Sequence, residues 1–206
     1  MNELAATVFV VDDESSVRKA LLRLLRLAGL SAAAFASAHE FLECHDPDTP
    51  GCLVLDLAMP GLNGLELQEA LATRGNLLPI IFLTGHGDLS SGVTAMKRGA
   101  VDFLTKPVDA ADLIEAVRSA IEKDHVARQA RAELTEIQGR FAALTPREYE
   151  VLCHVVSGKL NKQVAANLGT TEKTVKVHRA RVMEKAKVGS LAELVTLAHR
   201  AGVLPS

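Results

Sequence analysis

The sequence predicts two folded domains: a doubly wound α/β domain with a five-strand parallel sheet, joined by a long helical linker to a small all-α domain. From residue 7 to about 122, short apolar runs alternate with amphipathic stretches, which is typical of strand and helix units repeated around a parallel sheet. Beyond residue 142, four short amphipathic stretches separated by glycines predict helices. We therefore place the first domain at residues 1–122, the linker at 123–141 and the second domain at 142–206.

The strands of the first domain are predicted from apolar runs bounded by turn residues. The run at Ser31–Phe35 is rich in alanine and is the weakest of them. The functional edge of such a sheet lies at the carboxyl ends of its strands. The predicted strands are Thr7–Val11, Ser31–Phe35, Cys52–Leu55, Ile80–Leu83 and Val101–Leu104.

Helices are predicted between these strands. The first ends at Gly29, and Ser37 with Glu40 forms a candidate capping box for a short helix after the second strand. Apolar residues at helical spacing place the first helix at Val17–Ala28 and predict two further helices, at Leu65–Ala72 and Leu89–Arg98.

The linker is predicted to be helical because Pro and Gly are absent between Val108 and Gln138. If the last helix of the first domain continues through it, thirty residues would span roughly 45 Å. A break near Asp124 and His125 is the alternative. Gly139 is predicted to end the helix.

The second domain begins with a strong helix start, in which Thr145 is the cap, Pro146 the first helical residue and Glu148 the third. Helices are predicted at about 146–157, 161–168, 172–187 and 190–201, with Gly158, Gly169 and Gly189 between them. The second and third of these form a helix-turn-helix, whose second helix enters the major groove of DNA.

Charge is divided unevenly along the chain. Residues 1–125 hold 10 Lys or Arg and 18 Asp or Glu, a net charge of −8, whereas residues 126–206 hold 13 and 7, a net charge of +6. This difference suggests that only the second half binds a polyanion such as DNA. Ordinary solvated surface charge is the alternative. Within residues 172–187, six basic and two acidic residues give a net charge of +4, which suits contacts with phosphates.

The remaining composition predicts a cytoplasmic protein that does not enter membranes. No run of eighteen apolar residues is present, and the first residues lack the basic cluster of a secretion signal. Cys44, Cys52 and Cys153 are an odd number without metal-ligand spacing, so we expect reduced structural thiols.

Carboxylates gather at the predicted strand ends. Asp12 and Asp13 follow the first strand and Asp56 the third, so the three should converge on one edge of the sheet. Like charges that close together favour a hard divalent cation, and Mg²⁺ prefers oxygen ligands. Thr84 and Lys106 end the fourth and fifth strands and complete a set suited to phosphoryl transfer onto an aspartate.

In order along the chain, these motifs resemble the receiver domain of two-component response regulators, which has a flavodoxin-like fold. The motifs are Val11-Asp12-Asp13, Asp56 with Met59-Pro60-Gly61 and Gly64, Thr84-Gly85, and Phe103-Leu104-Thr105-Lys106-Pro107. The resemblance implies that Asp56 accepts the phosphoryl group, and that Asp12, Asp13, Asp56 and the Ala58 carbonyl hold Mg²⁺. It also implies that Lys106 and Thr84 bind the phosphoryl group, that Phe103 is an aromatic switch, and that the Lys106–Pro107 bond is cis.

Each of these residues also has a plain structural interpretation, as a helix cap, a surface charge or part of the core. An aspartate-dependent phosphatase is a further alternative. Such enzymes carry a second Asp two residues after the nucleophile, and here that residue is Ala58. We therefore expect a phosphoryl group on Asp56 to persist, with Ala58 and His86 tuning its lifetime.

The second domain resembles the LuxR-type DNA-binding domain through Leu144-Thr145-Pro146-Arg147-Glu148, Gly158, Asn161-Lys162-Gln163-Val164-Ala165 and Thr174-Val175-Lys176-Val177-His178. The resemblance implies a helix-turn-helix over Asn161–Ala180 and a dimer surface on the last helix. Departures at Thr170-Thr171, Ala180 and Ala186 put the pattern of base contacts in doubt. The implied DNA contacts are Lys173, Thr174, Lys176, Val177, His178, Arg179, Arg181 and Lys185, and the implied dimer residues are Leu191, Leu194, Val195 and Ala198.

Together the two resemblances identify the chain as a member of the FixJ-like branch of response regulators. They imply that a sensor histidine kinase phosphorylates Asp56, that the receiver then dimerises, and that the homodimer binds a double-stranded DNA operator. Contact with RNA polymerase and activation of transcription are expected, without enzymatic activity beyond the receiver's own phosphoryl transfer and dephosphorylation. The alternative is a constitutive DNA-binding protein whose receiver is vestigial.

Overall fold

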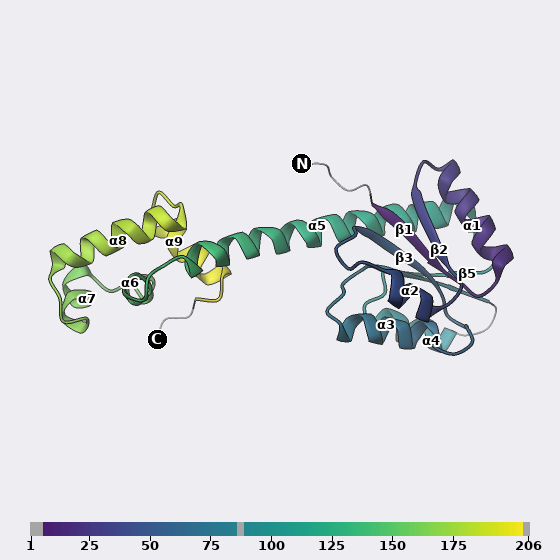
Figure 1. The fold of residues 1–206 in the computed structure, drawn as a ribbon, viewed down its shortest axis with the longest axis horizontal. Coiled ribbons are helices and arrows are strands. Elements are labelled where there is room, and N and C mark those ends of the chain that lie inside the picture. The colour runs from purple at the N-terminus through teal and green to yellow at the C-terminus, as the bar shows by residue number, and fades with distance from the viewer. Residues whose placement is uncertain (1–5, 86–88, 204–206) are drawn as a thin grey trace. The chain divides into compact units, whose positions relative to one another are not determined.

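The computed structural model describes residues 6–85 and 89–203, which form two compact units divided between Arg128 and Gln129 (Figure 1). The first unit contains a sheet of five parallel strands in the order β2-β1-β3-β4-β5. All five predicted strands are confirmed, with small changes at their ends. They are β1 (Thr7–Val11), β2 (Ser31–Phe35), β3 (Gly51–Asp56), β4 (Ile80–Thr84) and β5 (Asp102–Thr105).

Helices cover both faces of this sheet. Side chains of α2 (Ala38–Cys44), α3 (Gly64–Thr73) and α4 (Leu89–Lys97) pack into the cluster on one face. Those of α1 (Ser15–Leu27) and the first part of α5 (Ala110–Ala142) pack into the cluster on the other. This arrangement is the predicted doubly wound α/β fold.

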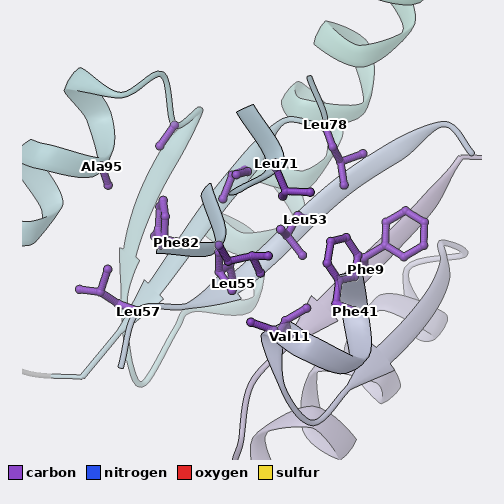
Figure 2. Close-up of a cluster of buried hydrophobic side chains, with 14 of the residues drawn as sticks. Phe9, Val11, Phe41, Leu53, Leu55, Leu57, Leu71, Leu78, Phe82 and Ala95 are labelled. Atoms are coloured by element: carbon purple, nitrogen blue, oxygen red, sulfur yellow. The ribbon is translucent and has the colours of Figure 1, made fainter. Parts of the chain in front are cut away.

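Successive residues of the central strands point to opposite faces, which is why these strands are apolar throughout. Leu53 and Leu55 of β3 lie in the cluster with Phe9 and Phe41 (Figure 2). Val54 between them packs on the opposite face. The rings of Phe9 and Phe41 meet edge to face with centroids 5.7 Å apart. Each such buried side chain contributes about 1.5–3 kcal/mol relative to exposure.

Helix starts in this unit use two different side-chain arrangements. Ser37 accepts a hydrogen bond from the Glu40 amide, but the Glu40 carboxylate accepts from Ala36 rather than from Ser37, so only half of the expected capping box forms. A complete box is present at α3, where Asn63 and Glu66 cap each other. The box at Asn63 and Glu66 was not predicted from the sequence.

The last residues of the first unit are held to its sheet by a buried aspartate. Asp124, on α5, accepts a hydrogen bond from the amide of Gly51 at 2.9 Å, at the start of β3. The Nε atom of Arg128 donates to the same carboxylate oxygen at 2.8 Å, and its remaining nitrogens donate to the carbonyls of residues 47, 48 and 49. Helical structure continues through Asp124 and His125, where a break was the alternative.

The second unit is helical, as predicted. Its core is built from α6 (Pro146–Val156), α7 (Asn161–Asn167), α8 (Glu172–Ala186) and α9 (Leu191–Arg200). Ile137 and Phe141 at the end of α5 are buried in the same core. Their burial explains why the prediction that Gly139 ends the helix is wrong: α5 continues to Ala142, because packing on either side outweighs the roughly 1 kcal/mol cost of a helical glycine.

The three cysteines are free thiols, with Cys52 and Cys153 buried and Cys44 exposed. Burial raises the pKa of Cys52 to about 12, with the charge of Asp124 adding to the effect. Within residues 6–85 and 89–203, none of the helices has the length and apolar character needed to cross a membrane.

Candidate functional site

Four predicted site residues lie at the carboxyl edge of the sheet because each ends or directly follows a parallel strand. Asp56 is the last residue of β3. This strand lies between β1, which is followed by Asp12, and β4, which ends at Thr84. Lys106 directly follows β5. Asp12, Asp56 and Thr84 are each at most 5% exposed. The fold therefore brings the predicted set together on one edge.

Three carboxylates form a cluster at this edge. Oxygen atoms of Asp12, Asp13 and Asp56 all lie within 4.8 Å of one another, with Asp13 exposed and the other two buried. Such a set of oxygen donors, open on one side, fits a hard cation that keeps several waters, as Mg²⁺ does. The Ala58 amide lies 3.4 Å from the Asp56 carboxylate. The role of the Ala58 carbonyl as a metal ligand stays a prediction.

Lys106 supplies the cation of the cluster. Its ammonium nitrogen lies 2.7 Å from Asp12 Oδ2, 3.0 Å from Asp56 Oδ2 and 3.9 Å from Glu14 Oε1. The side chain is 18% exposed, so the two closer pairs are only weakly screened by solvent. The ammonium thus bridges a carboxylate on each of two neighbouring strand ends.

Burial and these contacts determine the pKa values of Asp56 and Lys106. Burial raises the pKa of Asp56 above its ordinary value, and the nearby Asp12 adds to this, while Lys106 opposes it. For Lys106, burial acts to lower the pKa, but the hydrogen bonds that it donates to Asp12 and Asp56, together with the charges of these carboxylates, hold it above the ordinary value. Lys106 is therefore positively charged, and it lies beside Asp56, whose ionised form a further cation would stabilise.

Two residues near the site were missed by the sequence analysis. Arg18, on α1, donates from Nη1 to the backbone carbonyls of Asp12 at 2.6 Å and Asp13 at 2.8 Å. The amide of Glu14 donates to Asp12 Oδ1 at 2.8 Å. These contacts fix the backbone of both aspartates and the side chain of Asp12. An arginine one turn into a helix after two aspartates is the only sequence signal for this role.

The predicted switch residues occupy neighbouring strands. The Thr84 hydroxyl donates to its neighbour, the Gly85 carbonyl, at 3.1 Å. Phe103 is partly buried on β5 and faces α4, where a Cβ added to Gly92 would lie 2.9 to 3.1 Å from three atoms of the Phe103 ring. A glycine at this position therefore provides the space that the ring occupies. His86, the expected modulator of phosphoryl lifetime, lies outside the described residues, and the Lys106–Pro107 bond is cis, as expected.

The second unit presents a separate basic surface on α8. Thr171 caps this helix by accepting from the Thr174 amide. The apolar side of α8 contributes Val175, Val182 and Ala186 to the core. The opposite side exposes several of the predicted DNA contacts, including Lys173, Lys176, Val177 and Arg181. This amphipathic arrangement leaves one face of the helix available to a ligand.

Other predicted DNA contacts are engaged within the protein. Arg179 donates to Asn161 Oδ1 at 3.4 Å and so joins α8 to the start of α7. Thr174 and His178 are partly buried. The ammonium of Lys185 lies 2.6 Å from Glu148 Oε2. Glu148, which the sequence analysis identified only as part of a helix cap, therefore contacts the predicted recognition helix.

The predicted dimer surface is corrected by burial. Leu194 and Ala198 of α9 are at most 1% exposed and belong to the core of their own unit. They are therefore not available to a partner. Leu191 and Val195 are each 38% exposed on the same helix. Only these two of the four residues remain candidates for contact with a second copy.

Comparisons with known proteins cover both units. A family model described as the response regulator receiver domain matches residues 8–118, and one described as bacterial regulatory proteins, luxR family, matches residues 142–198. Nodulation protein W of Bradyrhizobium diazoefficiens is 46% identical over 198 residues, covering 96% of this chain and 87% of that protein. Transcriptional regulatory protein FixJ of Azorhizobium caulinodans is 45% identical, covering 97% of this chain and 94% of that protein. A solved structure of response regulator StyR matches with a TM-score of 0.87 and 46% identity, covering 95% of this chain and 99% of that chain.

Proposed function

Because the chain belongs to the two-component response regulators that join a receiver domain to a LuxR-type DNA-binding domain, we propose that phosphorylation of Asp56 controls its binding to DNA. The observation that carries this proposal is the contact between Lys106 and Asp56, 3.0 Å apart beside two further carboxylates. A vestigial receiver would not need this complete set. We assign residues 1–122 to the receiver, 123–141 to the linker and 142–206 to the DNA-binding domain.

The proposed reaction is a phosphoryl transfer from a phosphohistidine of a sensor kinase. A carboxylate oxygen of Asp56 attacks the phosphorus, the P–N bond breaks, and the electron pair leaves with the imidazole nitrogen of the kinase. Lys106 pairs with the phosphoryl oxygens as their charge shifts. Arg18 and the Glu14 amide hold Asp12 and Asp13 in place. The receiver thus promotes its own phosphorylation. The two families that match the chain are described as regulators rather than as metabolic enzymes.

Receiver domains bind Mg²⁺ at an acidic pocket, and the carboxylates of Asp12, Asp13 and Asp56 fit that role here. In the proposal these three side chains and the Ala58 carbonyl hold the ion. When bound, Mg²⁺ neutralises the negative charge of the carboxylates and of the incoming phosphoryl group.

The phosphoryl group is proposed to act through Thr84 and Phe103. Rotation of the Thr84 hydroxyl away from the Gly85 carbonyl would let it donate to a phosphoryl oxygen. Phe103 then follows into the space beside Thr84, and its ring changes its contact with Gly92 of α4. This coupling would alter the surface formed by α4 and β5 and so favour pairing of two receivers.

Pairing of receivers is proposed to bring two DNA-binding domains onto one operator. In the resting state the receiver restrains its own DNA-binding domain, and a phosphorylated homodimer releases it and attaches through both recognition helices at once. The proposed contacts to DNA come from the exposed face of α8 and its flanks: Lys173, Thr174, Lys176, Val177, His178, Arg179 and Arg181. Contact with RNA polymerase, activation of transcription and a cytoplasmic location complete the proposal.

The test is the intact mass of the protein after incubation with Mg²⁺ and acetyl phosphate. The wild type is expected to gain the mass of one phosphoryl group, and Asp56→Asn is expected to gain none. The exposed Asp46→Asn variant serves as a matched control, because it removes an aspartate outside the site. An equal gain in wild type and Asp56→Asn would contradict the assignment of the acceptor.

A further inference from the structure

The carboxyl-terminal end of the recognition helix α8 is bonded to the interior of its own unit. Lys185 Nζ donates to Glu148 Oε2 at 2.6 Å and to the carbonyl of Ala143 at 3.1 Å. Arg140 Nη1 donates to the carbonyl of Ala186 at 3.3 Å. The last turn of α8 is therefore attached both to α6 and to the end of α5.

The ionised form of Glu148 is stabilised mainly by Lys185. Its side chain is 3% exposed, and Oε2 also accepts from the amide of Thr145 at 2.9 Å. Lys185 and Thr145 together hold the pKa of Glu148 at about 2. If the ammonium were removed, the buried carboxylate would keep only its hydrogen bonds with Thr145 among the described residues, which is a strongly unfavourable state.

Lys185 differs in this respect from the other lysines on α8. Lys173 and Lys176 are exposed, and neither forms an ion pair among the described residues. The side chain of Lys185 is 35% exposed, and its ammonium already has a carboxylate and a carbonyl as partners. A contact with a DNA phosphate would have to compete with the buried Glu148, whereas Lys173 and Lys176 are free of such competition.

We propose that Lys185 and Glu148 are positioning residues that fix the angle of the recognition helix, and that Lys185 is not a phosphate contact. This inference rests on the proposed DNA-binding function. A phosphate contact supports all DNA sequences about equally and contributes to the dependence of binding on salt. A positioning pair instead supports the alignment of side chains with base edges, so its loss should weaken specific binding more than non-specific binding.

The experiment compares full-length variants on two DNA probes. The first is a duplex enriched from a random-sequence pool by the acetyl-phosphate-treated wild type, and the second is a duplex of scrambled sequence. Lys185→Met is expected to lose about tenfold or more of its affinity for the enriched duplex, while the salt slope on the scrambled duplex stays that of the wild type. Lys173→Met, at an exposed lysine of the same helix, is the control for a phosphate contact, with a slope reduced by about 0.9.

The effect of Glu148→Gln on DNA affinity has a different sign if Lys185 is a positioning residue than if it is a phosphate contact. Removing a negative charge from a phosphate-binding surface should leave DNA affinity unchanged or increase it. The positioning account expects weaker binding to the enriched duplex. It also expects the double variant Glu148→Gln/Lys185→Met to lose less than the product of the two single losses, because neither charge is then left unpaired. Lys185→Arg should restore binding to within about threefold, since arginine keeps the pair.

Thermal unfolding followed by circular dichroism establishes that each variant is folded at the temperature of the binding measurement. The inference is overturned if Lys185→Met lowers the salt slope as Lys173→Met does, or if Glu148→Gln binds the enriched duplex as tightly as the wild type. Failure of the wild type to enrich any duplex would overturn the proposed DNA-binding function itself. The two failures are therefore distinguishable.

Discussion

Lys106 Nζ lies 3.0 Å from Asp56 Oδ2, at the ends of two strands that are separated in the sheet by β4. The same ammonium lies 2.7 Å from Asp12 Oδ2. One cation therefore holds two carboxylates that would otherwise repel each other, and it already stands where a phosphoryl group on Asp56 would need a positive charge.

Replacing Lys106 should slow phosphoryl transfer without removing the acceptor. Lys106→Met is expected to lower the rate of mass gain with Mg²⁺ and acetyl phosphate by roughly 10²-fold, the usual cost of losing one preorganised electrostatic contact in a site. The exposed Lys97→Met is the matched control. A Lys106→Met rate equal to that of the wild type would show that the ammonium does not act on the transferred group.

Adding a methyl group at Gly92 should disturb the packing of Phe103. The new Cβ would lie 2.9 to 3.1 Å from the ring, which forces either the ring or α4 to move. Gly92→Ala is expected to lower the free energy of unfolding of the first unit by about 1–3 kcal/mol, measured by urea denaturation. Combining it with Phe103→Leu should recover part of the loss. If the two effects simply add, the ring and the glycine are not coupled in the way the geometry indicates.

Removal of Arg128 should destabilise the first unit through Asp124. Without the guanidinium, Asp124 remains 4% exposed with the Gly51 amide as its remaining hydrogen-bond donor. Arg128→Met is expected to cost about 1–3 kcal/mol in urea denaturation, allowing for the partial exposure of the arginine. Arg131→Met, three residues further along at an exposed position, should change stability by less than about 0.5 kcal/mol. Equal effects of the two substitutions would contradict this account.

The stability of the second unit should fall in acid through Glu148. Its pKa in the folded protein is lowered from 4.5 to about 2, mainly by the hydrogen bond from Lys185, so the folded state favours the ionised form. This contribution is complete above the ordinary pKa and is lost as pH falls from about 4.5 to about 2. Thermal unfolding across this range should show a weaker pH dependence in Glu148→Gln. An unchanged pH dependence would show that another group controls the acid transition.

The acidic site could be predicted because its chemistry demands particular residue types at strand ends, where alternation of strands and helices places them together. Arg18 could not, because it donates to backbone carbonyls, which leave no complementary side-chain pattern in the sequence. Asn63 and Glu66 are three residues apart, as in a capping box. An asparagine is a favoured N-cap residue, so this pair could have been predicted from the sequence.

Long-range packing decides several features of the second half that the local sequence does not show. Gly139 carries the local signal of a helix end, but Ile137 and Phe141 are buried in a core whose other residues are distant in the sequence. Lys185 belongs to a basic helix, and its partner Glu148 is 37 residues away, so nothing in the local pattern distinguishes it from Lys176. Leu194 and Ala198 follow a helical apolar spacing that fits a core as well as a dimer surface.

The central claim is that the state of Asp56 controls DNA binding, and the most direct measurement is the affinity of the full-length protein for the enriched duplex with and without acetyl phosphate. The account predicts that phosphorylation raises the affinity of the wild type about tenfold or more, through two-point attachment, and leaves Asp56→Asn unchanged. An equal wild-type affinity in both conditions, with phosphorylation verified by intact mass, would contradict it.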